Sequence, residues 1–178
     1  MAATLERNEP LDEACRLVGR FLKHYAIMER ALDLAIGKLL GLQGSTIDII
    51  GANITIAKKV EVLFSAEKFL AAIPEKGRER FLEKTRGRIL ALNDDRVIVA
   101  HSPFDPGPNG GVSFRKVVTR DELKFRDVPY SLQKIECKCK LAVGLATDLD
   151  RVAAEMKSYE PSFDFSDARN SASYFALL

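Results

Sequence analysis

Apolar residues recur every three or four positions along the N-terminal part of the chain. The recurring positions are Leu11, Cys15, Val18, Leu22, Tyr25, Leu32, Ala35 and Leu39. Because an α-helix turns once every ~3.6 residues, this spacing predicts one long helix over residues 11–41. Gly41 and Gly44 mark its end, since glycine is favoured just past a helix, and Ser45 can cap the helix that follows.

Two further stretches carry a similar period. The first runs from about 45 to 72, with an irregularity expected at 51–53, and Pro74 ends it because proline disrupts a helix interior. The second covers residues 131–157 and places an apolar stripe toward the core. Its inward positions are Ile135, Leu141, Leu145 and Leu149.

A third helix is expected between these two, over residues 75–100. Its first half is strongly charged, and its second half ends in the β-branched run 97–99. β-branched side chains crowd a helix, and Pro103 disfavours helical backbone in the residue before it. This helix should therefore end close to His101.

A β-hairpin is predicted after that helix. Residues 102–111 contain three prolines and three glycines and are expected to form a loop. The runs 112–118 and 123–128 are rich in strand-forming residues and are separated by a polar turn. Together they predict a hairpin over about 111–128.

These elements predict a single, mainly α domain: a bundle of four or five helices with a small β-hairpin between the third and last long helices. A chain of 178 residues, 47% of them hydrophobic, can bury a core of that size. We expect an N-terminal arm at 1–10, the helical domain at 11–158 and a flexible tail at 159–178.

Composition excludes several classes of protein. No run approaches the ~20 apolar residues that span a bilayer, and charged residues stand where a signal peptide needs an apolar run, so we expect a cytoplasmic protein without a membrane partner. The chain contains three cysteines, Cys15, Cys137 and Cys139, and only two histidines that could join them as metal ligands. This composition favours reduced thiols, and we expect neither a metal nor another cofactor. Phosphate-binding-loop, nucleophile-elbow and zinc-protease motifs are absent.

The net charge of +2 is unevenly distributed. Residues 1–13 sum to −3 and residues 159–178 to −2, which leaves +7 on the body between them. A basic body is compatible with RNA or another polyanion as a partner, and it is equally compatible with a solvated helical surface.

Each of the two histidines can be weighed separately. His24 lies within the first helix, where a structural role is expected. His101 lies where a rigid helix meets a loop, so its side chain can reach solvent from a fixed base. Arg96 precedes His101 by five residues, about 140° around a regular helix, so we expect the two side chains to converge only if the helix ends between them.

The segments around these residues resemble a known family. Arg96, four intervening residues and His101, at the end of a third bundle helix, resemble the Arg-x4–6-His signature of HEPN domains. FLKHYAIMERALDLAIGKLLGL is similar to the family's long first helix, AKKVEVLFSAEKFL to its second, and AHSPF to the ending of the signature. The Gly-Gly-Val-Ser-Phe hairpin is similar to one in small bacterial members. The resemblance covers about residues 11–157.

The resemblance implies a metal-independent endoribonuclease in a defence or toxin role, with Arg96 and His101 as catalytic residues in the cleft of a homodimer. RNA and a cognate antitoxin or other protein are the implied partners. The chemistry is reasonable, because histidine can move a proton near neutral pH and arginine offers donors that match phosphate oxygens. The alternative is a non-catalytic, HEPN-like dimeric module that binds a protein, nucleotide or nucleic acid.

One position departs from the family pattern. The residue after the arginine is commonly polar in the family, and here it is Val97. The neighbours that could orient the dyad instead are Asn93, Asp94 and Asp95. A purely structural interpretation is also open, in which Arg96 pairs with an acidic neighbour and His101 caps the helix C-terminus, where a cation is favoured.

Basic residues on the third helix and on the hairpin are candidate RNA-backbone contacts. They are Arg86, Arg88, Arg115 and Lys116. Phe114 and Phe125 lie among hairpin cations and could stack on bases. In the alternative arrangement, helix glutamates pair with the arginines and both aromatic rings face the core.

Overall fold

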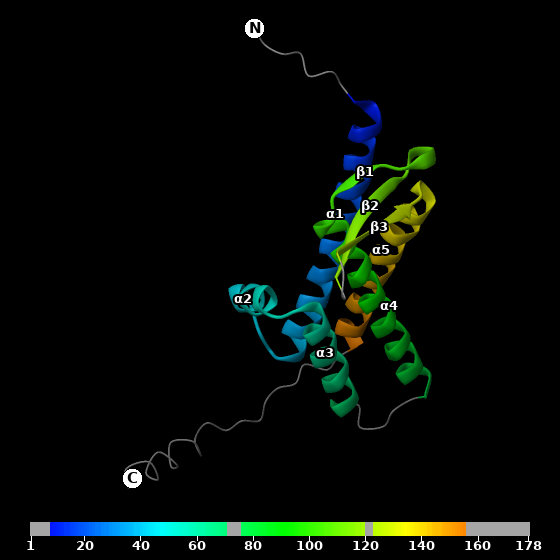
Figure 1. Cartoon of the computed structure of the whole chain (residues 1–178). Coiled ribbons are helices and arrows are strands. Elements are labelled where there is room, and N and C mark those ends of the chain that lie inside the picture. Colours follow the sequence, from blue (N-terminus) through cyan, green and yellow to red (C-terminus); the bar gives the residue numbers. More distant parts are fainter. Residues whose placement is uncertain (1–7, 71–75, 120–122, 156–178) are drawn as a thin grey trace, which may run out of the picture.

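The computed structural model describes residues 8–70, 76–119 and 123–155, and it is mainly helical with a small antiparallel sheet (Figure 1). The central element is α1, Glu9–Leu39, which contacts three other long helices. These are α3 (Ile56–Leu70), α4 (Lys76–His101) and α5 (Leu132–Glu155). The mainly α bundle predicted from the sequence is thus confirmed, although α1 begins two residues inside the predicted arm. The predicted tail lies outside the described residues.

The helical stretch predicted from about 45 to 72 is wrong as a single unit. It consists of α2, Ser45–Asn53, and α3, separated by two residues. Ile54 adopts extended backbone angles, φ −116° and ψ 132°, and Thr55 Oγ1 accepts a hydrogen bond from the Lys58 amide at 3.4 Å. The break therefore follows the glycine-containing segment 51–53 and starts α3 in a new direction, with α2 beside the lower part of α1 (Figure 1).

The core lies between α1, α3, α4 and α5 and includes the inner side chains of the sheet, Val112, Phe114 and Tyr130. Side chains that are fully buried there include Phe21, Met28, Leu63, Leu92 and Leu149. The end of α4 falls at His101, as the sequence predicted. Among the described residues, no helix is both long enough and apolar enough to cross a membrane.

The sheet has three strands rather than two. β2 (Val112–Thr119) and β3 (Leu123–Tyr130) form the predicted antiparallel hairpin, which extends two residues further than expected. β1 (Phe104–Pro106) pairs with β2, so the prediction of a loop throughout 102–111 is wrong at its start. The added strand has a packing reason: the Phe104 ring lies 5.9 Å from the Phe114 ring, and the two residues are partners across the strands.

The hairpin aromatics divide between the core and the surface. Phe114 is fully buried and packs edge-on against Tyr130, with ring centroids 5.2 Å apart. Phe125 is 62% exposed, opposite Val117 at 49%. The expectation that both phenylalanines face the core therefore holds for Phe114 only.

Candidate active site at the end of α4

The Arg96 and His101 side chains meet at the C-terminal end of α4. A guanidinium nitrogen, Nη1, lies 3.2 Å from Nε2 of the imidazole. The helix continues through His101, so the expectation that the pair converges only after a helix end is wrong. The arginine side chain is long enough to reach across the ~140° between the two positions. We refer to this pair as the Arg96–His101 dyad; Arg96 is half-buried and His101 is exposed.

Tyr25 joins the dyad to α1. Its ring centroid lies 5.9 Å from Cζ of Arg96, close enough for a cation–π contact, and its hydroxyl donates to Asn93 Oδ1 at 2.8 Å. The side chain is buried, and burial together with the nearby Glu29 carboxylate raises the pKa of Tyr25 well above its usual range, against an opposing effect of Arg96. Tyr25 is therefore a neutral hydrogen-bond donor at physiological pH.

Asp95 points away from its neighbour Arg96. Its carboxylate accepts a hydrogen bond from the Tyr130 hydroxyl at 2.5 Å, and it pairs with Lys138 Nζ of α5 at 2.5 Å. Lys134 Nζ lies 3.6 Å from the centre of the Tyr130 ring. Asp95 thus ties α4 to β3 and α5, while Asn93 faces Tyr25 and Asp94 is exposed. Of the three candidate orienting residues, Asn93 is the one linked to Arg96 through a shared neighbour.

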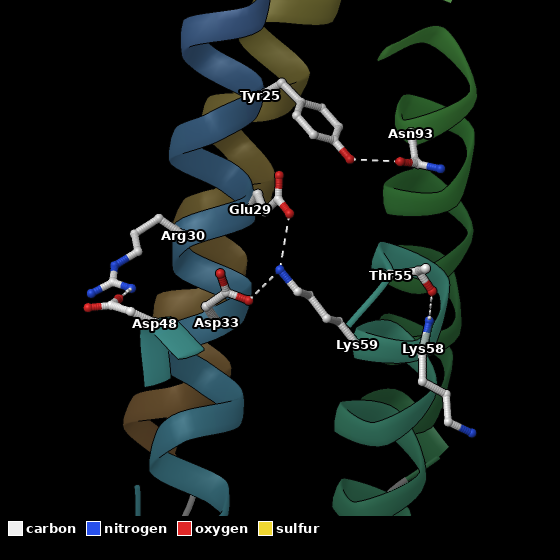
Figure 2. Close-up of polar contacts among 9 residues, drawn as sticks. All are labelled: Tyr25, Glu29, Arg30, Asp33, Asp48, Thr55, Lys58, Lys59 and Asn93. Atoms are coloured by element: carbon white, nitrogen blue, oxygen red, sulfur yellow. Dashed lines mark hydrogen bonds and ion pairs between the residues drawn. The ribbon is translucent and has the colours of Figure 1, made fainter. Parts of the chain in front are cut away.

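An ion triad with a buried cation and two partly exposed carboxylates lies along α1 from Tyr25 (Figure 2). Lys59 of α3 is 1% exposed, and its Nζ lies 3.0 Å from Glu29 Oε1 and 2.7 Å from Asp33 Oδ1. Tyr25, Glu29 and Asp33 are spaced four residues apart on α1, so they follow one line down the helix. The triad fixes the start of α3 against α1, just beside the Tyr25–Asn93 bond.

Sequence reasoning missed both Tyr25 as a neighbour of the dyad and Lys59 as a buried cation. Tyr25 fitted the apolar period of α1 and was assigned to the core. The available signal was the i, i+4 spacing of the two carboxylates, Glu29 and Asp33, in line with Tyr25 along α1. Nothing in the local sequence distinguishes Lys59 from Lys58, whose Nζ pairs with Glu61 at the surface.

The candidate RNA-contacting residues are not gathered around the dyad by direct contacts. Arg115 lies 3.8 Å from both Asp105 and Asp127, and Arg86 lies 3.7 Å from Glu83. Arg88 is exposed. Lys116 is exposed and stands directly opposite Arg126 across the hairpin, a like-charge pair that an anion would relieve.

The remaining candidates for chemistry lie elsewhere. His24 is half-buried on α1, and its Nδ1 has no hydrogen-bond partner within the described part of the chain. Cys15 and Cys137 are exposed free thiols, and burial raises the pKa of the third, Cys139. No cluster of three or more metal-ligating side chains occurs within residues 8–70, 76–119 and 123–155.

Comparison with known proteins adds no relative. No family model matches the chain, and neither the curated proteins nor the solved structures contain a match.

Proposed function

We propose that this protein is a metal-independent endoribonuclease of the HEPN type, with Arg96 and His101 as its catalytic residues. The observation that carries the proposal is the 3.2 Å contact between guanidinium and imidazole at the exposed end of a rigid helix. Two side chains with complementary roles in phosphate chemistry are already adjacent there, and the half-buried Arg96 is held by Tyr25 from the next helix.

The dyad has the groups that RNA cleavage needs. An arginine has donors only, so in this contact Nε2 of His101 acts as the acceptor. When the guanidinium turns from His101 to a bound phosphate, the Nε2 lone pair that it releases can take the proton of a ribose 2′-hydroxyl as that oxygen attacks phosphorus. The guanidinium fork stabilises the charge that develops on the phosphoryl oxygens. A 2′,3′-cyclic phosphate and a free 5′-hydroxyl are the expected products.

The reaction also needs a proton for the leaving 5′-oxygen, and one histidine cannot act as base and acid at the same time. We propose that a second copy supplies the other dyad across a two-fold axis, since such an axis places identical residues face to face. The outer face of α4 fits this arrangement, because His101 is exposed there and Val97, one turn earlier, is 46% exposed.

The test is cleavage of a broad RNA panel in the presence of EDTA. Wild type should release 2′,3′-cyclic phosphate ends, and Arg96→Ala and His101→Ala should each lose activity by at least about 100-fold. His24→Ala and Arg16→Ala are the matched controls, since they remove the same residue types from α1, outside the dyad, and should retain activity. Folding and dimerisation are checked for every variant. Full activity in folded His101→Ala would contradict the proposal.

A second candidate function is favoured by one observation. Ile27 and Leu34 of α1 are 46% and 43% exposed, and they line a surface groove of about 490 Å³ together with Ala146 and Asp150 of α5. Exposed apolar grooves are typical of protein-binding sites. In this candidate, the chain is a non-catalytic dimeric module that binds a partner such as a cognate antitoxin. Absence of cleavage by wild type, with partner binding lost in Ile27→Glu, would support it.

A further inference from the structure

Tyr25 interacts with two side chains of α4, those of Arg96 and Asn93. Its ring contacts the Arg96 guanidinium, and its hydroxyl bonds Asn93 one turn earlier on the same helix. The backbone of α1 that carries it is fixed by its position at the centre of the bundle and, one turn further on, by the Glu29–Lys59 ion pair (Figure 2). Tyr25 is thus a rigid support at the side of a long, flexible arginine.

We propose that Tyr25 is a positioning residue that holds Arg96 against His101, a role that rests on the ribonuclease function proposed above. Tyr25 is 3% exposed and sits below the dyad, so it acts through Arg96 rather than on the substrate. The hydroxyl bond to Asn93 fixes where the ring lies relative to α4, and the ring face fixes where the guanidinium can go.

Catalysis is sensitive to this kind of support. A free arginine side chain populates many rotamers, and holding it in one lowers the entropy lost when a phosphate binds. A displacement of about 1 Å in a reacting group can cost on the order of 100-fold in rate. Family members commonly have a polar residue after the arginine, where this chain has Val97. Asn93 is the best candidate to take over its role, because Tyr25 links Asn93 to Arg96.

The chain contains a matched control for a merely structural role. Tyr130 is also buried at 3% exposure, and its hydroxyl also donates to an α4 side chain, Asp95. The side-chain partners of Tyr130 and Asp95 are each other, Lys134 and Lys138, and not the dyad. Tyr130→Phe therefore removes the same kind of buried hydrogen bond from the same helix without touching the guanidinium.

The experiment compares four single variants and one double variant in steady-state RNA cleavage. Tyr25→Leu should lower kcat by roughly 10- to 100-fold with KM little changed, since the ring is lost. Tyr25→Phe keeps the ring and should lose less, while Tyr130→Phe should keep wild-type kcat. In the Arg96→Ala background, Tyr25→Leu should have no further effect, because its effect passes through the guanidinium.

A second measurement is independent of turnover. The Nε–H group of Arg96 should be ordered on the ps–ns timescale by NMR in wild type and in Tyr130→Phe, and mobile in folded Tyr25→Leu. If the wild-type protein does not cleave RNA, the ribonuclease proposal is contradicted. The NMR measurement still tests whether Tyr25 holds the Arg96 side chain in place. An ordered Arg96 in Tyr25→Leu, a loss of kcat in Tyr130→Phe equal to that in Tyr25→Leu, or additive losses in the double variant would each overturn the positioning role.

Discussion

At the residue scale, Lys59 is a cation that the fold holds away from water. Its charge is matched by two carboxylates on α1, at 3.0 and 2.7 Å. Burying an ion is costly, and the cost is offset only while its partners stay in place. Removing the cation leaves Glu29 and Asp33 beside each other without compensation, and Asp33 is only 13% exposed.

Lys59→Met should therefore lower the free energy of unfolding by about 3–5 kcal/mol, the usual cost of breaking a buried ion pair. Urea denaturation followed by circular dichroism measures it. Lys58→Met is the control on the neighbouring residue, because the Lys58–Glu61 pair is more than half exposed on both sides and should contribute less than ~1 kcal/mol. Equal losses in the two variants would show that the triad does not stabilise the start of α3.

The buried tyrosines predict a stability limit at alkaline pH. Burial raises the pKa of both Tyr25 and Tyr130 well above the usual value, with Glu29 and Asp95 as further causes. A group whose pKa is higher in the folded state stabilises the fold below its unfolded pKa, about 10 for tyrosine, and that contribution is lost as the pH rises further. Stability should thus be insensitive to these groups at neutral pH and fall above pH ~10.

An alkaline titration checks this expectation through phenolate absorbance and circular dichroism. The chain has four tyrosines, and two lie outside the described residues. We expect a late stage of ionisation that coincides with loss of helical signal, and we expect that stage to disappear from the absorbance of a Tyr25→Phe/Tyr130→Phe variant. Ionisation of all four tyrosines near pH ~10, before unfolding, would contradict it.

At the element scale, the approach of the sheet to the start of α5 depends on Gly111. A Cβ built on this residue would lie 2.4 Å from the Tyr130 carbonyl oxygen and 3.0 Å from Ser131 Cα. Both neighbours are backbone atoms, which cannot turn aside as a side chain would. β2, β3 and α5 meet at this point, so a shift there moves the strand that carries Tyr130.

Gly111→Ala should therefore destabilise the protein by about 1–3 kcal/mol, as overpacking does in a well-packed interior. Gly144→Ala is the opposite case, because Gly144 is an exposed position within α5 and its added Cβ meets nothing within 4 Å. That variant should gain roughly 0.5–1 kcal/mol from helix propensity. Thermal and urea unfolding of the two variants should give opposite signs; two gains would show that the Gly111 contact is relaxed at little cost.

The long elements could be predicted from the sequence, since they follow from periodicity and from turn-forming residues. The ends of α1 and α4 and the hairpin agree with expectation to within about two residues, which is the usual uncertainty of a helix boundary. The irregularity expected at 51–53 anticipated the break at Ile54 and Thr55, which follows it directly. The short strand β1 could not be predicted, because it depends on a tertiary contact. β1 forms through the pairing of Phe104 with Phe114, ten residues later.

The candidate site was predictable in its residue types but not in its contacts. Residue spacing suggested that Arg96 and His101 would lie on different faces of a continuous helix, and the length of the arginine side chain brings them together nonetheless. Pairing of Arg96 with an acidic neighbour was an open alternative, but partners from β3 and α5 hold the neighbouring Asp95. Such choices between neighbours are decided by residues distant in sequence, so a local pattern cannot reveal them.

At the scale of the whole molecule, α1 separates two surfaces with different properties. Residues that are two apart in an α-helix lie about 200° apart around its axis, so Tyr25 and Ile27 point in nearly opposite directions. Tyr25 points toward α4 and the dyad, while Ile27 lines the groove between α1 and α5. The protein therefore offers one exposed face at the end of α4 and another, more apolar face on the far side of α1.

These two surfaces give the proposed dimer a direct test. If the paired dyads form one site, the second copy must cover the outer face of α4 rather than the α1–α5 groove. Val97 lies beside His101 and is 46% exposed. In the proposed dimer, Val97→Glu would place two negative charges face to face across the two-fold axis. This variant should therefore be a folded monomer that no longer cleaves RNA. Ile27→Glu, equally exposed in wild type, should remain a dimer with full cleavage. Light scattering measures the oligomeric state of each variant, and the cleavage assay measures its activity. A dimer broken by Ile27→Glu but not by Val97→Glu would place the two dyads on opposite sides of the assembly and exclude a shared site.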